Sequence, residues 1–145
     1  MNEIVLDASA LLAVLNQEAG AEMLTPELLS GAAISTVNLA EVHSKLVGRG
    51  LRPDDAWEAA LSPVGEAVPF TAEHAKIVGD LVAETSPLGL SLGDRACLAL
   101  GLALKAPVYT ADRSWKKLKV GARINVIRCR VFLKEKDSTS VGATK

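Results

Sequence analysis

Four acidic residues that lie far apart in the sequence occupy positions from which carboxylates could act together: Asp7, Glu41, Asp94 and Asp112. Asp7 closes a short apolar segment, and Asp112 follows another that ends at Thr110. Glu41 and Asp94 each lie about one turn into a predicted helix. In an open α/β sheet the carboxyl ends of the strands share one edge, and ligands bind in the crevice there. We therefore expect the four acids to meet at one site.

Each acid taken alone also has a structural explanation. Asp7 could cap a helix that starts at residue 8. Asp112 could favour a helix N-terminus through the macrodipole, worth ~0.3–1 kcal/mol. In two places a polar residue and an acid have the spacing of a capping box, Asn38 with Glu41 and Ser91 with Asp94. For any single acid, capping and metal binding both stay open.

As a set, the acids are harder to explain by capping. Asp94 opens a segment rich in Leu, Ala and Gly, where an ionised carboxylate is costly without a partner. Leu98, not a basic residue, follows one turn later. Carboxylates that gather without basic partners repel one another, and a divalent cation removes that repulsion. Oxygen ligands suit Mg²⁺ or Mn²⁺, whereas His43 and His74 lack neighbours at zinc-ligand spacing. Such a site predicts metal-assisted hydrolysis of phosphate esters.

Short apolar segments alternate along the chain with segments of helical period. The predicted strands are residues 3–7, 32–35, 67–70, 107–110 and 124–127, the third of them at an edge because of Pro69. The predicted helices are residues 8–16, two short pieces within 19–30, 38–47, 53–61, 71–84, 91–105 and 112–118. This alternation predicts an α/β fold with a central parallel β-sheet sandwiched by helices. We interpret Trp57 and Trp115 as packing residues, although Trp115 could also stack on a base.

Length and composition favour one domain in a reducing compartment. The chain has 145 residues, of which 49% are apolar, enough for one core without disulfides. We expect residues 1–133 to form the domain and the polar residues 134–145 to form a disordered tail. The apolar runs are too short for a membrane span or a signal peptide, which predicts a cytoplasmic protein. Cys97 and Cys129 are isolated in sequence and are interpreted as reduced thiols.

Charge is unevenly distributed although the net charge is only −1. Residues 1–104 hold 5 Lys or Arg against 14 Asp or Glu, whereas residues 105–136 hold 10 against 2. An acidic body beside a basic segment fits an anionic substrate held next to a cation-loaded site, although ordinary surface charge explains it equally well. Arg95 could orient a phosphate or form a surface ion pair. The candidates for contact with the phosphates of such a substrate are Arg95, Arg113, Lys116 and Lys117.

Four blocks of the sequence resemble the PIN-domain family in their order and spacing. The blocks are Ile-Val-Leu-Asp-Ala-Ser-Ala-Leu at 4–11, Asn-Leu-Ala-Glu-Val at 38–42, Leu-Ser-Leu-Gly-Asp-Arg-Ala-Cys-Leu-Ala-Leu-Gly at 90–101 and Val-Tyr-Thr-Ala-Asp-Arg-Ser-Trp at 108–115. The resemblance covers about residues 2–130 and is strongest to the VapC-type toxins of bacterial toxin–antitoxin pairs.

The resemblance implies an α/β/α fold and endoribonuclease activity that needs Mg²⁺ or Mn²⁺. It also implies an RNA substrate, a homodimer and a cognate antitoxin that inhibits by occupying the site. The positions that match the family's acidic metal site are Asp7, Glu41, Asp94 and Asp112, and those that match its accompanying small hydroxyl residues are Ser9 and Thr110.

Two other functions are compatible with parts of this pattern. A response-regulator receiver domain also uses strand-end acids and Mg²⁺, but it needs an acidic pair near its first strand and an Asp after its third. Here the third predicted strand leads through Phe70 into Thr71. A PIN-fold binding module without significant nuclease activity would keep the fold and lose the chemistry. Growth arrest on expression, relieved by the neighbouring reading frame, would distinguish a toxin from such a module.

Overall fold

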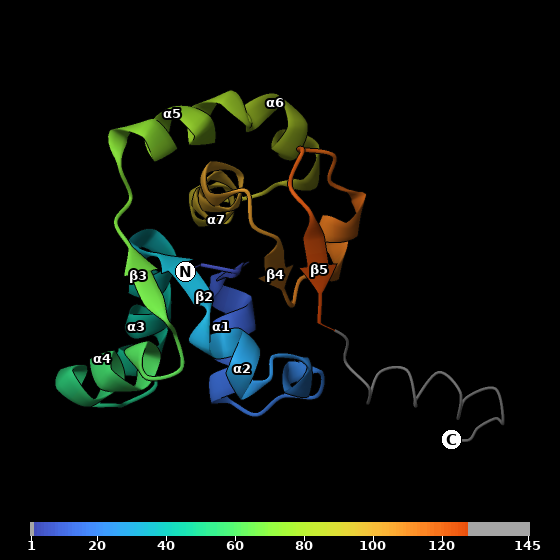
Figure 1. Cartoon of the computed structure of the whole chain (residues 1–145). Coiled ribbons are helices and arrows are strands. Elements are labelled where there is room, and N and C mark those ends of the chain that lie inside the picture. Colours follow the sequence, from blue (N-terminus) through green and yellow to red (C-terminus); the bar gives the residue numbers. More distant parts are fainter. Residues whose placement is uncertain (1, 128–145) are drawn as a thin grey trace, which may run out of the picture.

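A computed structural model describes residues 2–127 of the chain, and Met1 and residues 128–145 lie outside the described part. Five parallel strands form one sheet in the order β3-β2-β1-β4-β5 (Figure 1). In chain order they are β1 (Ile4–Leu6), β2 (Ala32–Ser35), β3 (Glu66–Val68), β4 (Val108–Thr110) and β5 (Ile124–Val126). All five predicted strands are therefore present, and β3 lies at an edge as expected.

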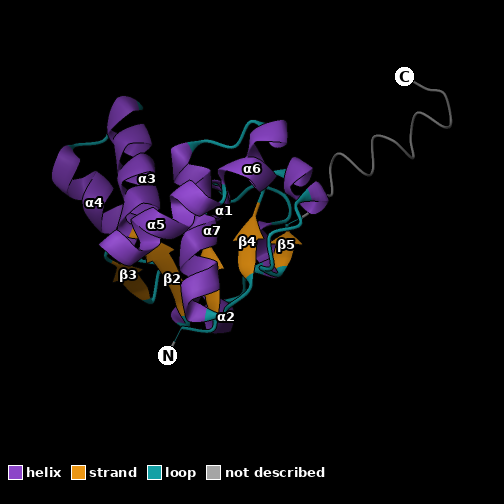
Figure 2. Ribbon diagram, turned by 90° about the horizontal axis from the view of Figure 1, so that it is seen from above, coloured by secondary structure: helices purple, strands orange, loops and turns teal. Residues whose placement is uncertain are grey.

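Helices cover both faces of the sheet. The α-helices are α1 (Ala8–Leu15), α2 (Pro26–Ser30), α3 (Thr36–Gly48), α4 (Pro53–Leu61), α5 (Ala72–Asp80), α6 (Val82–Thr85) and α7 (Leu92–Leu104). Short 3₁₀ helices are η1 (Ala21–Met23), η2 (Ser86–Leu88) and η3 (Arg113–Lys117). In Figure 1, α5, α6 and α7 lie on one side of the sheet and α1 to α4 on the other, and in Figure 2 α5 and α7 lie in front of the strands. This arrangement confirms the predicted fold class.

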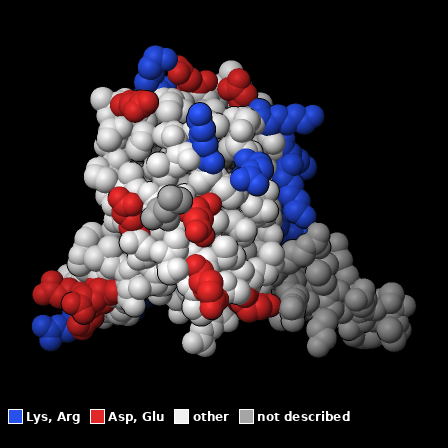
Figure 3. All heavy atoms as spheres, viewed as in Figure 1, with Lys and Arg blue, Asp and Glu red and all other residues white. Residues whose placement is uncertain are grey.

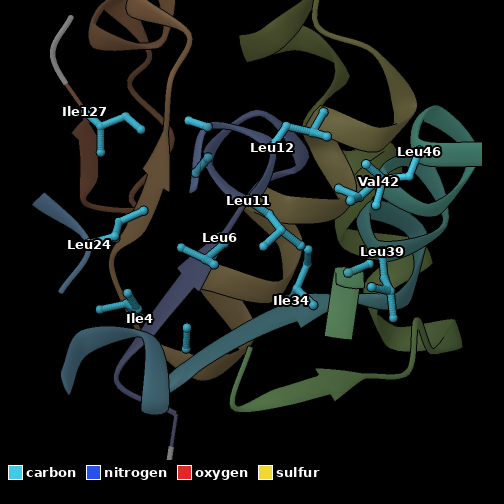
Figure 4. Packing of buried hydrophobic residues seen from close by; sticks show 14 of the residues in the cluster. Ile4, Leu6, Leu11, Leu12, Leu24, Ile34, Leu39, Val42, Leu46 and Ile127 are labelled. Atoms are coloured by element: carbon cyan, nitrogen blue, oxygen red, sulfur yellow. The ribbon is translucent and has the colours of Figure 1, made fainter. Parts of the chain in front are cut away.

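Alternating side chains of β1 supply both halves of the core. Ile4 and Leu6 belong to a buried cluster formed with α1, α3 and β2, in which Leu11 and Ile34 are fully buried (Figure 4). Val5 points to the other face and joins the cluster around α7. Successive strand residues face opposite sides, and full burial of a Leu or Ile is worth about 1.5–3 kcal/mol. The apolar strand thus fixes helices on both sides of itself.

Several helix boundaries differ from the sequence prediction for local reasons. α3 begins at Thr36, two residues early, because the Ser35 hydroxyl accepts a hydrogen bond from the N–H of Val37 and caps the helix. The helix predicted over 71–84 is divided at Leu81 into α5 and α6, two residues after Gly79, a poor helix former. The helix predicted over 112–118 is the shorter 3₁₀ helix η3.

The two tryptophans have different environments. Trp115 is 1% exposed and packs in the cluster around α7, which confirms its packing role. Trp57 is 43% exposed and makes an edge-to-face contact with His43, so the expectation that it packs in the same way is wrong.

Some predictions fall on the ends of the chain. Cys97 is a buried free thiol, whereas Cys129, the domain end at residue 133 and the tail at 134–145 lie outside the described residues.

None of the helices within residues 2–127 combines the length and the apolar character that crossing a bilayer requires.

Candidate active site

One cavity of about 280 Å³ lies where β1 and β4 end. It is bordered by α1, α3, the start of α7 and the segment after β4. The residues that line it are Asp7, Ala8, Ser9, Leu12, Asn16, Glu18, Glu41, Lys45, Arg49, Asp94, Ala111 and Asp112. The structure thus brings to one place the four acids that the sequence disperses over more than a hundred positions.

Asp7 is the most deeply placed of the four acids, with 4% of its surface exposed. It is the N-cap of α1, because its Oδ1 accepts a hydrogen bond from the N–H of Ala10 at 2.8 Å. Burial raises the pKa of Asp7 to about 6, and the negative charge of Asp94 adds to the rise, although hydrogen bonds from Thr110, Ala10 and Ser9 lower it. A cation beside this carboxylate would favour its charged form and reverse the effect of burial.

The two predicted hydroxyl residues connect the ends of β1 and β4. Thr110 donates a hydrogen bond to Asp7 Oδ2 at 2.6 Å, and its oxygen accepts one from the N–H of Asp112 at 3.0 Å. Ser9 donates to Asp7 Oδ1 at 2.8 Å and accepts from the N–H of Ala111 at 2.9 Å. Both hydroxyls therefore orient the Asp7 carboxylate and fix the segment that leads to Asp112.

Glu41 is held against the first turn of α7. The amide of Asn38 donates to Glu41 Oε1 and to the carbonyl oxygen of Gly93, at 2.9 Å in both cases. A Cβ on Gly93 would lie 2.5 Å from Glu41 Oε2, so a larger residue at position 93 would displace the Glu41 carboxylate. The capping-box interpretation of Asn38 and Glu41 is wrong, because Ser35 is the N-cap of α3.

Asp94 and Asp112 both act in helix capping. Asp94 Oδ2 accepts from the N–H of Ser91 and its own N–H donates to the Ser91 hydroxyl, which completes the expected capping box of α7. Asp112 is the N-cap of η3, and its Oδ1 accepts from both the N–H and the hydroxyl of Ser114.

Capping uses only one oxygen of these carboxylates. Among the residues that the structure describes, no hydrogen bond reaches Glu41 Oε2, Asp94 Oδ1 or Asp112 Oδ2. None of the four acids forms an ion pair within residues 2–127. Carboxylate oxygens that are held in place and not neutralised by basic side chains are the ligands that a hard divalent cation requires.

The spacing of these carboxylates also bears on the kind of cation that the cavity can hold. In the described part of the chain, no three His, Cys, Asp or Glu side chains are grouped closely enough to ligate one ion directly. Mg²⁺ usually keeps several waters and takes only one or two carboxylates from a protein. The cavity therefore fits a hydrated ion better than a cage of protein ligands, and the assignment of all four acids as ligands stays a prediction.

The model of the PIN domain family matches residues 4–121, which include all four acids. The chain belongs to the PIN domain family. No curated protein matches the sequence. Similar solved structures include DNA-bound VapBC from Salmonella typhimurium, with 18% identity, a TM-score of 0.69 and coverage of 88% of this chain and 100% of that one. Another is VapBC2 from Rickettsia felis bound to a promoter DNA fragment, with 20% identity, a TM-score of 0.67 and coverage of 86% and 98%. A third is Mycobacterium tuberculosis VapC20, a Sarcin-Ricin loop cleaving toxin, with 20% identity, a TM-score of 0.64 and coverage of 83% and 99%.

The basic residues around this PIN domain's cavity are not those that the sequence suggested. Arg95 donates from Nη1 to the carbonyl oxygen of Val78 at 3.0 Å, so its guanidinium is directed to α5. The surface ion pair expected for Arg95 is therefore wrong within residues 2–127. Lys116 and Lys117 are exposed on η3, after Asp112. On the face in Figure 3, Lys and Arg gather at the side where β5 and the segment before it lie.

Among the residues that the structure describes, the basic ones that line the PIN domain's cavity are Lys45 and Arg49, which were not predicted from the sequence. They lie four and eight positions after Glu41 on α3, so helical period alone places them near its face. That spacing was the available signal, although most Lys and Arg of the chain lie in residues 105–136.

Proposed function

We propose that this PIN domain is an endoribonuclease that hydrolyses RNA phosphodiester bonds with Mg²⁺ or Mn²⁺ as cofactor. The observation that carries the proposal is the shared cavity, in which four carboxylates are oriented by the fold and neutralised by no basic side chain within residues 2–127. When bound, the cation would activate a water as nucleophile and offset charge on the phosphate.

The four acids contribute differently to such a site. Asp7, Asp94 and Asp112 would hold the hydrated cation, directly or through its bound waters, and Glu41 would either join them or orient the attacking water. Ser9 and Thr110 position Asp7 through hydrogen bonds of 2.8 and 2.6 Å. Removing a group that orients a metal ligand in this way typically lowers metal affinity or activity strongly.

We further propose that the nuclease is the toxin of a toxin–antitoxin pair. The similar structures from Rickettsia felis and Salmonella typhimurium are VapBC assemblies, and VapC20 is described as a toxin. The partners proposed for this chain are accordingly a cognate antitoxin and a second copy of itself in a homodimer. Expression should arrest growth of a bacterial host, and co-expression of the adjacent reading frame should relieve the arrest.

Cleavage of a labelled RNA by the purified chain tests the activity directly. Asp94→Asn removes the charge and keeps an oxygen for the capping bond to Ser91, so it should abolish cleavage while the fold stays intact. Asp55→Asn is the matched control, since Asp55 is an exposed acid in the first turn of α4 and does not line the cavity. The control should cleave like the wild type.

Two results would contradict the proposal. Equal cleavage in chelator and in Mg²⁺ would refute metal dependence. Wild-type protein that binds RNA without cleaving it in either Mg²⁺ or Mn²⁺ would favour a binding module over an enzyme.

A further inference from the structure

One face of α3, together with the residue that caps its C-terminus, carries an acid followed by two cations. Glu41, Lys45 and Arg49 are spaced by four residues, and all three line the cavity. At about 1.5 Å of rise per residue, Lys45 lies roughly 6 Å and Arg49 roughly 12 Å along the helix axis from Glu41. The cations therefore form a row that leads away from the acids along one wall.

Both cations are available for a ligand although carboxylates surround them. Five acids line the same cavity, yet within the part of the chain that the structure describes neither Lys45 nor Arg49 forms an ion pair with any of them. Both side chains are exposed. Arg49 donates one long hydrogen bond, from Nη1 to Asn16 Oδ1 at 3.5 Å, and within residues 2–127 its other N–H groups stay available to bind an anion.

The position of the row relates it to the acids. α3 follows β2, and η3 with Lys116 and Lys117 follows β4, so the two basic groups stand on either side of β1 and Asp7 in the sheet order. A nucleic-acid strand that places one phosphate over the acids would carry its neighbouring phosphates onto α3 in one direction. Backbone phosphates are the groups that Lys and Arg bind in this way.

We infer that Lys45 and Arg49 bind backbone phosphates of the RNA on one side of the bond that is cleaved. The inference rests on the proposed nuclease function, because it names how the same cavity holds its substrate. It assigns to α3 both a reacting-site acid and the contacts that set the path of the strand.

The test measures binding of a labelled, mixed-sequence single-stranded RNA by fluorescence anisotropy, from about 50 to about 200 mM NaCl. All proteins carry Asp94→Asn so that cleavage does not interfere. Lys45→Ala and Arg49→Ala should each weaken binding roughly fivefold at low salt. Each should also reduce the slope of log K against log salt by about 0.7, the value for one lost phosphate contact on a single strand. Lys45→Arg should retain the wild-type slope.

Lys76→Ala is the matched control, because it removes a positive charge from α5 outside the cavity lining, where Lys76 pairs with Asp80. It should leave the slope unchanged. In the active protein, the double variant should raise KM with kcat nearly constant, as expected for a contact made equally in the ground state and the transition state.

Two outcomes separate this inference from the proposed function. An unchanged slope in the double variant would overturn the inference while cleavage by the wild type still supported the nuclease. It would also point to a partner protein, not RNA, as the ligand of the row. A wild type that fails to cleave, with the slope lowered in both single variants, would overturn the nuclease and uphold the phosphate site.

Discussion

Replacing Asp7 by Asn isolates the cost of burying a charge in the cavity. Asp7 is 4% exposed, and burial raises its pKa from 3.8 to about 6. One pKa unit corresponds to about 1.4 kcal/mol, so the ionised side chain lowers the stability of the metal-free protein by about 3 kcal/mol. Asn stays neutral at every pH and keeps an oxygen for the N–H of Ala10.

The sign of the effect follows from proton binding. Between pH 3.8 and about 6 the folded protein holds a proton on Asp7 that the unfolded chain has released. The stability that the folded protein gains from keeping Asp7 protonated is therefore fully present below pH 3.8 and is lost as the pH rises through 6. The stability of Asp7→Asn minus that of the wild type should rise by up to about 3 kcal/mol over this window and then stay level. The hydrogen bond lost from Thr110 shifts the whole curve and leaves its shape unchanged.

Urea unfolding in chelator from pH 4 to pH 8 measures this difference. Glu58→Gln removes an exposed carboxylate from α4 and serves as the control, with an effect within about 0.5 kcal/mol throughout. Mg²⁺ at about 100 times its Kd should stabilise the wild type alone by roughly 2.7 kcal/mol. A flat difference curve for Asp7→Asn in chelator would refute the argument from burial, and equal stabilisation of both proteins by Mg²⁺ would refute Asp7 as a ligand.

Two further substitutions separate the geometry of the site from the stability of the fold. Thr110→Val removes a hydrogen bond that lowers the pKa of Asp7. The acidic limb of the pH profile of kcat/KM should therefore move to higher pH. A profile that coincides with that of the wild type would contradict this role of Thr110. Gly93→Ala places a Cβ 2.5 Å from Glu41 Oε2 and should reduce cleavage at least tenfold, while stability is kept or rises because Ala favours a helix by about 1 kcal/mol. Gly79→Ala, in α5 with no atom near the added Cβ, should stabilise similarly and leave cleavage intact; equal loss of cleavage in both variants would show that the effect is not local to Glu41.

The fold could be predicted closely because its signals are local. Five apolar segments marked the five strands, and Pro53 and Ser91 marked the starts of α4 and α7. The boundary at Leu81 and the 3₁₀ geometry of η3 were not predictable in this way. They depend on how short segments pack across α7 and β5, which a periodic pattern does not encode.

The acids of the site were predicted from the sequence, whereas its cations were marked only by their spacing from Glu41. Strand ends and helix starts concentrate at one edge of a parallel sheet, so residue position within an element was enough to group Asp7 with Asp112. Lys45 lies in the last turn of α3 and Arg49 caps its C-terminus, where Lys and Arg are usually exposed to solvent without a role in a site. The packing of α3 against α1 and α7 turns the face that carries Glu41 toward the cavity, and Lys45 and Arg49 follow from that placement.

Capping and cation binding, which the sequence presents as alternatives, are compatible in the folded chain. A carboxylate has two oxygens, and Asp94 and Asp112 each give one to a helix start and keep the other without a partner within residues 2–127. The capping bond fixes a side chain that would otherwise lose rotamer freedom on binding a cation. A residue at a helix start can therefore cap and present a preorganised ligand at once. By this reasoning an Asp94→Asn variant, which keeps an oxygen for the N–H of Ser91, should retain the fold and lose the cation, and retention of both would mean that capping is the only role of Asp94.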